Sequence, residues 1–181
     1  MMRTVGRVSG FTLIELLLAL TVAALLLAVA LPSYQSLRQE QMVRAATQAV
    51  YTDMMLLKSE AIKRNKPLTF KIFNPGQADW CYRIAIDGSC DSCADSCSSI
   101  EGRKGVDAGE FSGVLLASNF AISGAEIAIE INNRRGAFKS LHGAPHNGSI
   151  CLRSGDSESR VIVALNGRIR TDVITGVSPC I

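Results

Sequence analysis

The chain contains one long apolar segment, residues 11–31, in which Glu15 is the only charged residue. As a helix, these 21 residues would extend about 30 Å, the thickness of the hydrocarbon core of a bilayer. A carboxylate inside a membrane costs about 2.5–3.5 kcal/mol on insertion scales, so it usually has a partner or lies near an interface. The segment therefore predicts a single membrane anchor with a cation close to Glu15.

The residues before the anchor indicate a source for that cation. Arg3 and Arg7 favour a leader that stays in the cytoplasm, and Gly10 places a small residue directly before the apolar segment. An ordinary secretory signal has a shorter apolar core, with its small residues after that core. Cleavage after Gly10 would instead keep the anchor and leave the ammonium of Phe11 as a counter-charge for Glu15. The alternative, an uncleaved anchor whose Glu15 snorkels to the headgroups, explains neither Gly10 nor the position of the carboxylate.

The junction reads Gly10-Phe11-Thr12-Leu13-Ile14-Glu15, and Pro32 follows the apolar segment. This arrangement resembles the amino terminus of type IV pilins and of the pilin-like proteins of secretion systems. The resemblance implies that prepilin peptidase removes residues 1–10 as a leader and methylates Phe11. It also implies that residues 11–33 form the transmembrane and fibre-core half of a helix, and that Glu15 guides assembly with other pilin subunits. Residues 34–181 would form a head in the periplasm, anchored in the bacterial inner membrane before assembly and carried to the cell surface in the pilus.

A second helical pattern follows Pro32, which can kink or locally break a helix. Apolar residues recur at spacings of three and four, as on the buried stripe of an amphipathic helix: Val43, Ala46, Val50, Met54, Leu57 and Ala61. Basic residues from Lys63 to Lys66 complement the dipole at a helix end, and Pro67 supplies a stop. We therefore predict one long helix from Phe11 to about Asn65.

After Pro67 the apolar period changes from that of a helix to that of strands. Strands are predicted at residues 68–73, 80–86, 113–117, 125–131, 149–153, 160–165 and 168–174. The turn-rich residues 87–113 are predicted to form one long loop. One helix followed by a run of strands indicates an α+β fold, in which a long N-terminal helix packs on a C-terminal antiparallel sheet, as in pilins.

Six cysteines follow the anchor: Cys81, Cys90, Cys93, Cys97, Cys151 and Cys180. On the oxidising side of a membrane these are expected to form disulfides, and six cysteines allow 15 complete pairings. We favour a bridge between Cys151 and Cys180, with the other four paired among themselves. A metal or redox site at the Cys90-x2-Cys93-x3-Cys97 spacing is the less favoured alternative. His142 and His146 are expected to be surface-loop residues, and we expect no metal and no cofactor.

The most informative part of the head is Asn166-Gly167-Arg168-Ile169-Arg170. Asn-Gly between two strand-like runs predicts a tight hairpin, because both turn residues tolerate positive φ. Arg168 and Arg170 would project from the same side of an extended strand, where two guanidiniums can bind successive phosphates. A strict two-residue turn, however, pairs Val163 with Arg170 and places arginines and aliphatics on one face. Either the loop is wider, or that face is not buried near its end.

The long helix, the strand-rich head and the positions of Cys151 and Cys180 resemble the GspH/FimT family of minor pilins and secretion pseudopilins. Gly167, Arg168 and Arg170 match the Gly-Arg-x-Arg motif of FimT-like minor pilins, which bind DNA during natural transformation, or competence. The resemblance implies non-specific binding of double-stranded DNA through its phosphate backbone. Further DNA contacts are considered at five other basic residues: Arg134, Arg135, Lys139, Arg153 and Arg160.

Other functions share the same anchor. A structural minor pilin that primes or caps pilus assembly would need no DNA contact, and neither would a pseudopilin of a type II secretion system. Residues 67–130 contain four Lys/Arg and nine Asp/Glu, net −5, whereas residues 131–181 contain seven and three, net +4. The acidic stretch is compatible with a protein-facing role. An enzyme is not expected, because the chain has no Ser/His/Asp or Cys/His spacing of catalytic type and no phosphate-binding glycine loop.

Overall fold

The computed structural model describes residues 12–86, 90–94, 100, 102, 105–120, 123, 126–143 and 147–174. The chain divides into two compact units, Met1–Leu37 and Arg38–Ile181. We call the second unit the head; the sequence places the start of the head at residue 34, close to this boundary.

A single helix, α1 (Leu13–Arg64), contributes to both units and continues through Pro32. In the first unit its apolar side chains are exposed, and it is long and apolar enough to cross a membrane. The prediction of one long helix is confirmed, although its predicted first residue, Phe11, lies outside the described residues.

The carboxyl end of α1 is a Schellman-type cap. Asn65 has a left-handed conformation with φ 52°. Its amide donates to the carbonyl of Ile62, and the amide of Lys66 donates to the carbonyl of Ala61, both at 3.2 Å. The helix therefore ends where the basic residues and Pro67 predict.

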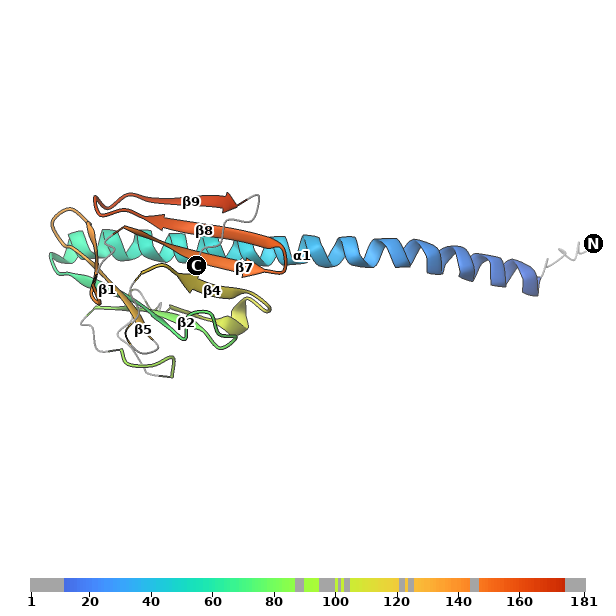
Figure 1. The fold of residues 1–181 in the computed structure, drawn as a ribbon, viewed down its shortest axis with the longest axis horizontal. Helices are drawn as coiled ribbons and strands as arrows, with labels where there is room; N and C mark the ends of the chain where they lie inside the picture. The colour runs from blue at the N-terminus through green and yellow to red at the C-terminus, as the bar shows by residue number, and fades with distance from the viewer. Residues whose placement is uncertain are drawn as a thin grey trace, which may run out of the picture. The chain divides into compact units, whose positions relative to one another are not determined.

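The strands form two antiparallel sheets (Figure 1). The first has the order β3-β2-β1-β5-β6 and consists of β1 (Leu68–Phe73), β2 (Cys81–Ala85), β3 (Gly105–Asp107), β5 (Glu126–Ile131) and β6 (Phe138–Ser140). The second has the order β4-β7-β8-β9 and consists of β4 (Leu115–Ser118), β7 (Gly148–Ser154), β8 (Ser157–Val163) and β9 (Ile169–Ile174). The predicted α+β class with antiparallel strands is confirmed, and the strands divide between two sheets.

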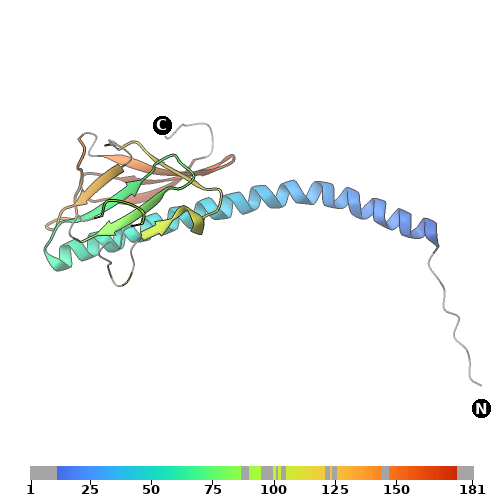
Figure 2. The ribbon, with the colours of Figure 1, turned by 90° about the horizontal axis from the view of Figure 1, so that it is seen from below.

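Both sheets and the part of α1 in the head share one core. Figures 1 and 2 show this part of the helix lying along the strands. The predicted apolar stripe is buried at every position, with exposed fractions of 0–2%: Val43, Ala46, Val50, Met54, Leu57 and Ala61. Trp80, the only tryptophan, is 1% exposed, and its Nε1 donates to the carbonyl of Val114 at 2.7 Å.

The structure corrects the predicted long loop at residues 87–113. This region contains a short strand, β3, and a turn of 3₁₀ helix, η1 (Ala108–Glu110). β6 is a second strand that the sequence does not predict. Each has three residues, which is too short for an alternating pattern to stand out. Only Val106 is buried in β3, so the pairing with β2 rather than apolar content places this strand.

The cysteine-containing segment 90–94 lies on the outer face of the first sheet, where hydrogen bonds from two cations hold it. Nζ of Lys71 donates to the carbonyl of Cys90 at 2.7 Å, and a guanidinium nitrogen of Arg83 donates to the carbonyl of Cys93 at 2.5 Å. A disulfide joins Cys81 to Cys93. Both cations are nearly buried, so ionic hydrogen bonds and a covalent link fix the segment. A small apolar cluster of Phe73, Cys81, Ala85 and Cys90, against which Cys93 packs, adds to them.

Candidate functional site

The turn between β8 and β9 contains three residues, 165–167, and not the two that Asn-Gly predicts. The amide of Ala164 donates to the carbonyl of Arg168 at 3.0 Å, and the amide of Gly167 donates to the carbonyl of Ala164 at 2.9 Å. The second bond closes a β-turn, and Gly167 ends it with φ 82°. Since Asn166 does not have a positive φ, the two-residue turn with both residues at positive φ is wrong, and the loop is of the common three-residue type.

The wider turn removes the conflict between arginines and aliphatics. Val163 pairs with Ile169, which packs against the core, whereas Arg170 pairs with Ile162 on the opposite face of β8. Side chains alternate along an extended chain, so Arg168, directly before the edge strand β9, and Arg170, within it, project from the same outer face. Both arginines are exposed.

Gly167 is buried although it lies in a turn, because it contacts a second turn. A Cβ added to Gly167 would lie 2.5 Å from the carbonyl oxygen of Gly136 and 3.2 Å from that of Arg135. These are backbone atoms, which cannot rotate away as a flexible side chain can. Glycine is therefore required at this position for two reasons, its positive φ and its close contact with the backbone of Gly136.

The second turn joins β5 to β6 and carries Arg134 and Arg135, both exposed. The amide of Arg134 donates to Oδ1 of Asn132 at 2.7 Å, an Asx turn that shapes the loop. Nδ2 of Asn133 donates to the carbonyl oxygen and to Oδ1 of Asn65, at 3.1 and 2.9 Å. The turn is thereby fixed to the end of α1.

Lys58 of α1 contacts both turns. Its Nζ donates to the carbonyl of Gly167 at 2.6 Å. Its aliphatic stem lies against Gly136, where an added Cβ would be 2.6 Å from Cγ and Cε of the lysine. Lys58 is half-buried and its ammonium is directed at a backbone oxygen, so it supports the two turns from beneath.

The end of α1 adds further basic side chains around one buried acid. Glu60, 3% exposed, accepts hydrogen bonds from Nζ of Lys63 at 3.1 Å and from Nε of Arg64 at 2.6 Å. The bond from Arg64, followed by that from Lys63, holds the pKa of Glu60 below its ordinary value of 4.5. Lys66 follows in the loop after the helix.

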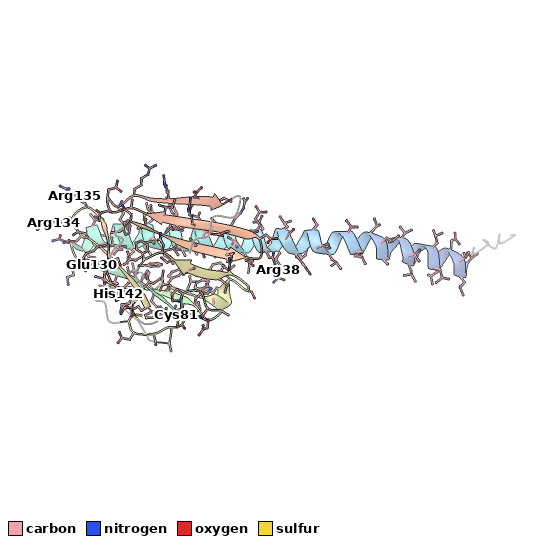
Figure 3. All side chains as sticks on the ribbon, viewed as in Figure 1. Arg38, Cys81, Glu130, Arg134, Arg135 and His142 are labelled. Carbon is pink, nitrogen blue, oxygen red and sulfur yellow. A yellow bond between two sulfur atoms is a disulfide. The ribbon has the colours of Figure 1, made fainter. Side chains whose placement is uncertain are left out.

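Three segments therefore meet at one place in the head: the end of α1, the β5–β6 turn and the β8–β9 turn. We call the exposed basic side chains of these segments the basic end: Lys63, Arg64, Lys66, Arg134, Arg135, Arg168 and Arg170. In Figure 3, Arg134 and Arg135 lie at one end of the head and Arg38 lies at the other.

The other three basic residues proposed as DNA contacts, Lys139, Arg153 and Arg160, each have a carboxylate opposite them on the neighbouring strand. A guanidinium nitrogen of Arg160 is 2.8 Å from an oxygen of Asp172, its partner in the β8–β9 pairing. Lys139 of β6 lies opposite Glu130 of β5. The charge of each is accordingly faced by an acid from the neighbouring strand.

Arg153 lies away from the basic end. It lies opposite Glu158 of β8, beside the β7–β8 turn, where Gly155 approaches the side chain of Gln39. Seven residues of β8, about 20 Å of extended chain, separate this turn from the β8–β9 turn. The structure thus brings Arg134 and Arg135 to the Gly-Arg-x-Arg turn, but not Arg153.

At the amino-terminal end of α1, Glu15 takes part in a capping box. The amide and hydroxyl of Thr12 donate to its Oε2 at 3.3 and 3.2 Å, and the amide of Glu15 donates to Oγ1 of Thr12 at 3.3 Å. Gly10 and Phe11, the predicted processing residues, lie outside the described residues.

Comparison with known proteins identifies the family of this chain. A family model described as type II transport protein GspH matches residues 46–167, more than half of the chain. The chain belongs to the GspH family. A second model, the prokaryotic N-terminal methylation motif, matches residues 6–31 of this GspH-family chain.

Among solved structures, the minor pseudopilin EpsH from the Type 2 Secretion System of Vibrio cholerae is similar, with 13% identity and a TM-score of 0.46. The similarity covers 72% of this chain and 96% of EpsH. No curated protein sequence matches the chain.

Membership in the GspH family identifies the chain as a minor pseudopilin or type IV minor pilin that associates with other pilin subunits. Its apolar helix and methylation motif fit a single-pass membrane anchor. The family match includes the β5–β6 turn and ends at Gly167, so Arg168 and Arg170 lie directly beyond it.

The four cysteines of this GspH-family head that the structure describes are oxidised. The Cys81–Cys93 bridge falls within the block of four that the sequence pairs internally, and Cys90 and Cys151 are also disulfide-bonded. Cys97 and Cys180 lie outside the described residues, as does His146. Donor atoms of Cys81, Cys93 and Asp107 lie within 4.8 Å of one another, but the two sulfurs are bonded to each other and Asp107 pairs with Arg83 at 2.6 Å. His142 lies 3.5 Å from a carboxylate oxygen of Glu126.

Lys58 and Gly136 are the residues of this site that sequence reasoning missed. Lys58 stands off the apolar stripe of the helix pattern, where a lysine is ordinarily solvated. Gly136 follows two arginines in what reads as a simple turn. Their importance comes from contacts across more than 30 residues of sequence, and a single sequence carries no signal for such contacts.

Proposed function

We propose that this GspH-family protein is a minor pilin that binds double-stranded DNA without sequence preference, through Arg168 and Arg170, and contributes to DNA uptake in natural transformation. The supporting observation is the exposed pair of arginines at the start of β9, one directly before the strand and one on its outer face. Within the described part of the chain neither arginine has a carboxylate partner, and Asp172, on the same face, pairs with Arg160 instead.

The chemistry of this pair suits a phosphate backbone. Each guanidinium offers a planar fork of donors that fits phosphate oxygens. Contacts restricted to phosphates position DNA without reading its bases, which is what uptake of arbitrary DNA requires. The same contacts release counterions, so binding weakens steeply as salt rises.

The anchor fits the same role. We propose that cleavage after Gly10 exposes the amine of Phe11, that Glu15 uses this amine as a counter-charge during assembly, and that the head then stands in the periplasm and in the pilus. The capping box of Thr12 holds the carboxylate at the first turn of α1, next to the position of the new terminus. In this role the protein is a binding subunit, and no catalytic step is assigned to it.

The test uses the full chain in non-ionic detergent micelles and fluorescently labelled duplexes of unrelated sequence, titrated across a salt series. The wild-type protein should bind all duplexes similarly, and log affinity should fall linearly with log salt. The variant Arg168→Gln/Arg170→Gln should lose affinity for every duplex alike. The control Arg38→Gln/Arg153→Gln removes the same charge from exposed positions away from the basic end and should bind like wild type.

A second function is favoured by the family match itself, which names a type II transport protein and ends before Arg168. In that case the protein would be a structural minor pilin that primes or caps assembly, or a pseudopilin of a type II secretion system, with no DNA contact. Absence of DNA binding by the wild-type chain at low salt would favour this role. Equal binding by wild type and the Arg168→Gln/Arg170→Gln variant would exclude the proposed site.

A further inference from the structure

The β5–β6 turn and the β8–β9 turn behave as one structural unit. The carbonyl of Gly136 would be 2.5 Å from a Cβ at Gly167, so the two backbones are in direct contact. Arg134 and Arg135 precede Gly136, and Arg168 follows Gly167. The four arginines of the two turns therefore emerge from adjoining loops, although more than 30 residues of sequence separate the pairs.

Both turns are held in place independently of any ligand. Lys58 donates to the carbonyl of Gly167 and packs against Gly136, and Asn133 is bonded to Asn65 at the end of α1. The arrangement is thus preorganised, so binding does not require ordering of these loops. The nearby carboxylate of Glu60 already accepts from Lys63 and Arg64, which leaves the arginines of the turns facing solvent.

We propose that Arg134 and Arg135 form a second phosphate-binding site, so that one DNA duplex lies across both turns. This inference rests on the proposed function and assigns a further part of the same surface. Two arginines at the Gly-Arg-x-Arg turn can neutralise about two phosphates, which predicts a salt slope of about −1.8 for duplex DNA. Four arginines predict a salt slope of about −3.6. The slope therefore reports the number of phosphate contacts, and it distinguishes binding by one turn from binding by both.

The test compares four variants of the full chain in non-ionic detergent micelles with wild type, using duplexes of unrelated sequence. They are Arg134→Gln/Arg135→Gln, Arg168→Gln/Arg170→Gln, the quadruple combination, and the control Arg38→Gln/Arg153→Gln. Each double variant at the turns should make the slope shallower by about 1.8, and the quadruple variant should make it shallower by about 3.6. The control should keep the wild-type slope.

A charge-preserving variant separates phosphate contact from folding. Arg134→Lys/Arg135→Lys should restore the slope, because lysine neutralises a phosphate as a point charge, although affinity falls with the loss of the planar fork. Thermal unfolding of all variants, followed by the fluorescence of buried Trp80, should match wild type, since the substituted side chains are exposed.

The outcomes separate the two proposals. A wild-type slope in Arg134→Gln/Arg135→Gln, with a loss in Arg168→Gln/Arg170→Gln, overturns the second site and leaves the proposed function standing. A wild-type slope in both double variants at the turns overturns the second site and the proposed DNA-binding function. An equal loss in the control and in Arg134→Gln/Arg135→Gln overturns the second site as well, because it would reflect overall charge.

Discussion

At the scale of single residues, the Gly-Arg-x-Arg motif depends on its glycine as much as on its arginines. Gly167 has φ 82°, and its neighbour across the contact is the backbone of Gly136. The conformation alone would cost an alanine about 1–2 kcal/mol. The contact adds a second cost, because two turns fixed to α1 would have to separate to admit a methyl group.

We expect Gly167→Ala to destabilise the head by more than Gly76→Ala, which provides a matched control. Gly76 has φ 81°, but a Cβ there meets nothing within 4 Å, so it reports the conformational cost alone. Overpacking at Gly167 should add about 1–3 kcal/mol, measured by urea unfolding of the full chain with Trp80 fluorescence. Gly167→Ala should also weaken DNA binding with every arginine present, whereas equal stabilities of the two variants would contradict the contact.

At the scale of elements, the end of α1 contributes a pH-dependent stability through Glu60. Its pKa in the folded protein is lowered by Arg64 and then Lys63, so its contribution is complete above 4.5, the ordinary value. The contribution is lost as pH falls through the lowered folded pKa. The difference in unfolding midpoint between wild type and Glu60→Gln should therefore be largest near neutral pH and shrink below about pH 4.5.

The control for this prediction is Glu40→Gln, which breaks another i,i+4 pair of the same helix, with Arg44. The side chain of Glu40 is 43% exposed and that of Glu60 is 5% exposed, so the Glu40 pair is screened by solvent and should change the profile less. Trp80 fluorescence between pH 7 and pH 3 gives both profiles. A wild-type and a Glu60→Gln profile that stay parallel over this range would contradict the assignment.

The elements that the sequence predicted are those with long, regular apolar patterns. The stripe from Val43 to Ala61 and the strand at residues 68–73 are found at their predicted positions. β3 and β6 could not be predicted, because three residues are too few to show a period. The hairpin was predicted but its length was not: a two-residue turn would pair Val163 with Arg170, and burial of Val163 with Ile169 overrides the preference of Asn-Gly.

The candidate site was predictable only in part, because a single sequence shows local geometry but not contacts between distant segments. Arg168 and Arg170 are two apart in an extended run, so their common face follows from local geometry. The selection of Arg134 and Arg135 over Arg153 depends on which turns meet in space. That is decided by Lys58, Gly136 and the pairing order of two sheets, which are non-local features.

At the scale of the whole molecule, the first 37 residues and the head are separate units, and the core belongs to the head. The first fully buried apolar side chain of α1 is Val43, and every residue of the basic end follows it. We therefore expect a fragment of residues 38–181 to unfold cooperatively, with the same midpoint as the head in the full chain. Its salt slope for duplex DNA should also equal that of the full chain.

A second truncation makes this expectation specific to the boundary. A fragment of residues 51–181 removes three buried apolar residues of α1: Val43, Ala46 and Val50. Burying a valine contributes about 1.5–3 kcal/mol, so the two valines alone represent a large part of a typical stability of about 5–15 kcal/mol. The shorter fragment should be unfolded or strongly destabilised in urea titrations with Trp80 fluorescence. A fragment of residues 38–181 that was equally unstable would mean that the first unit supports the head, contrary to the division of the chain at Leu37.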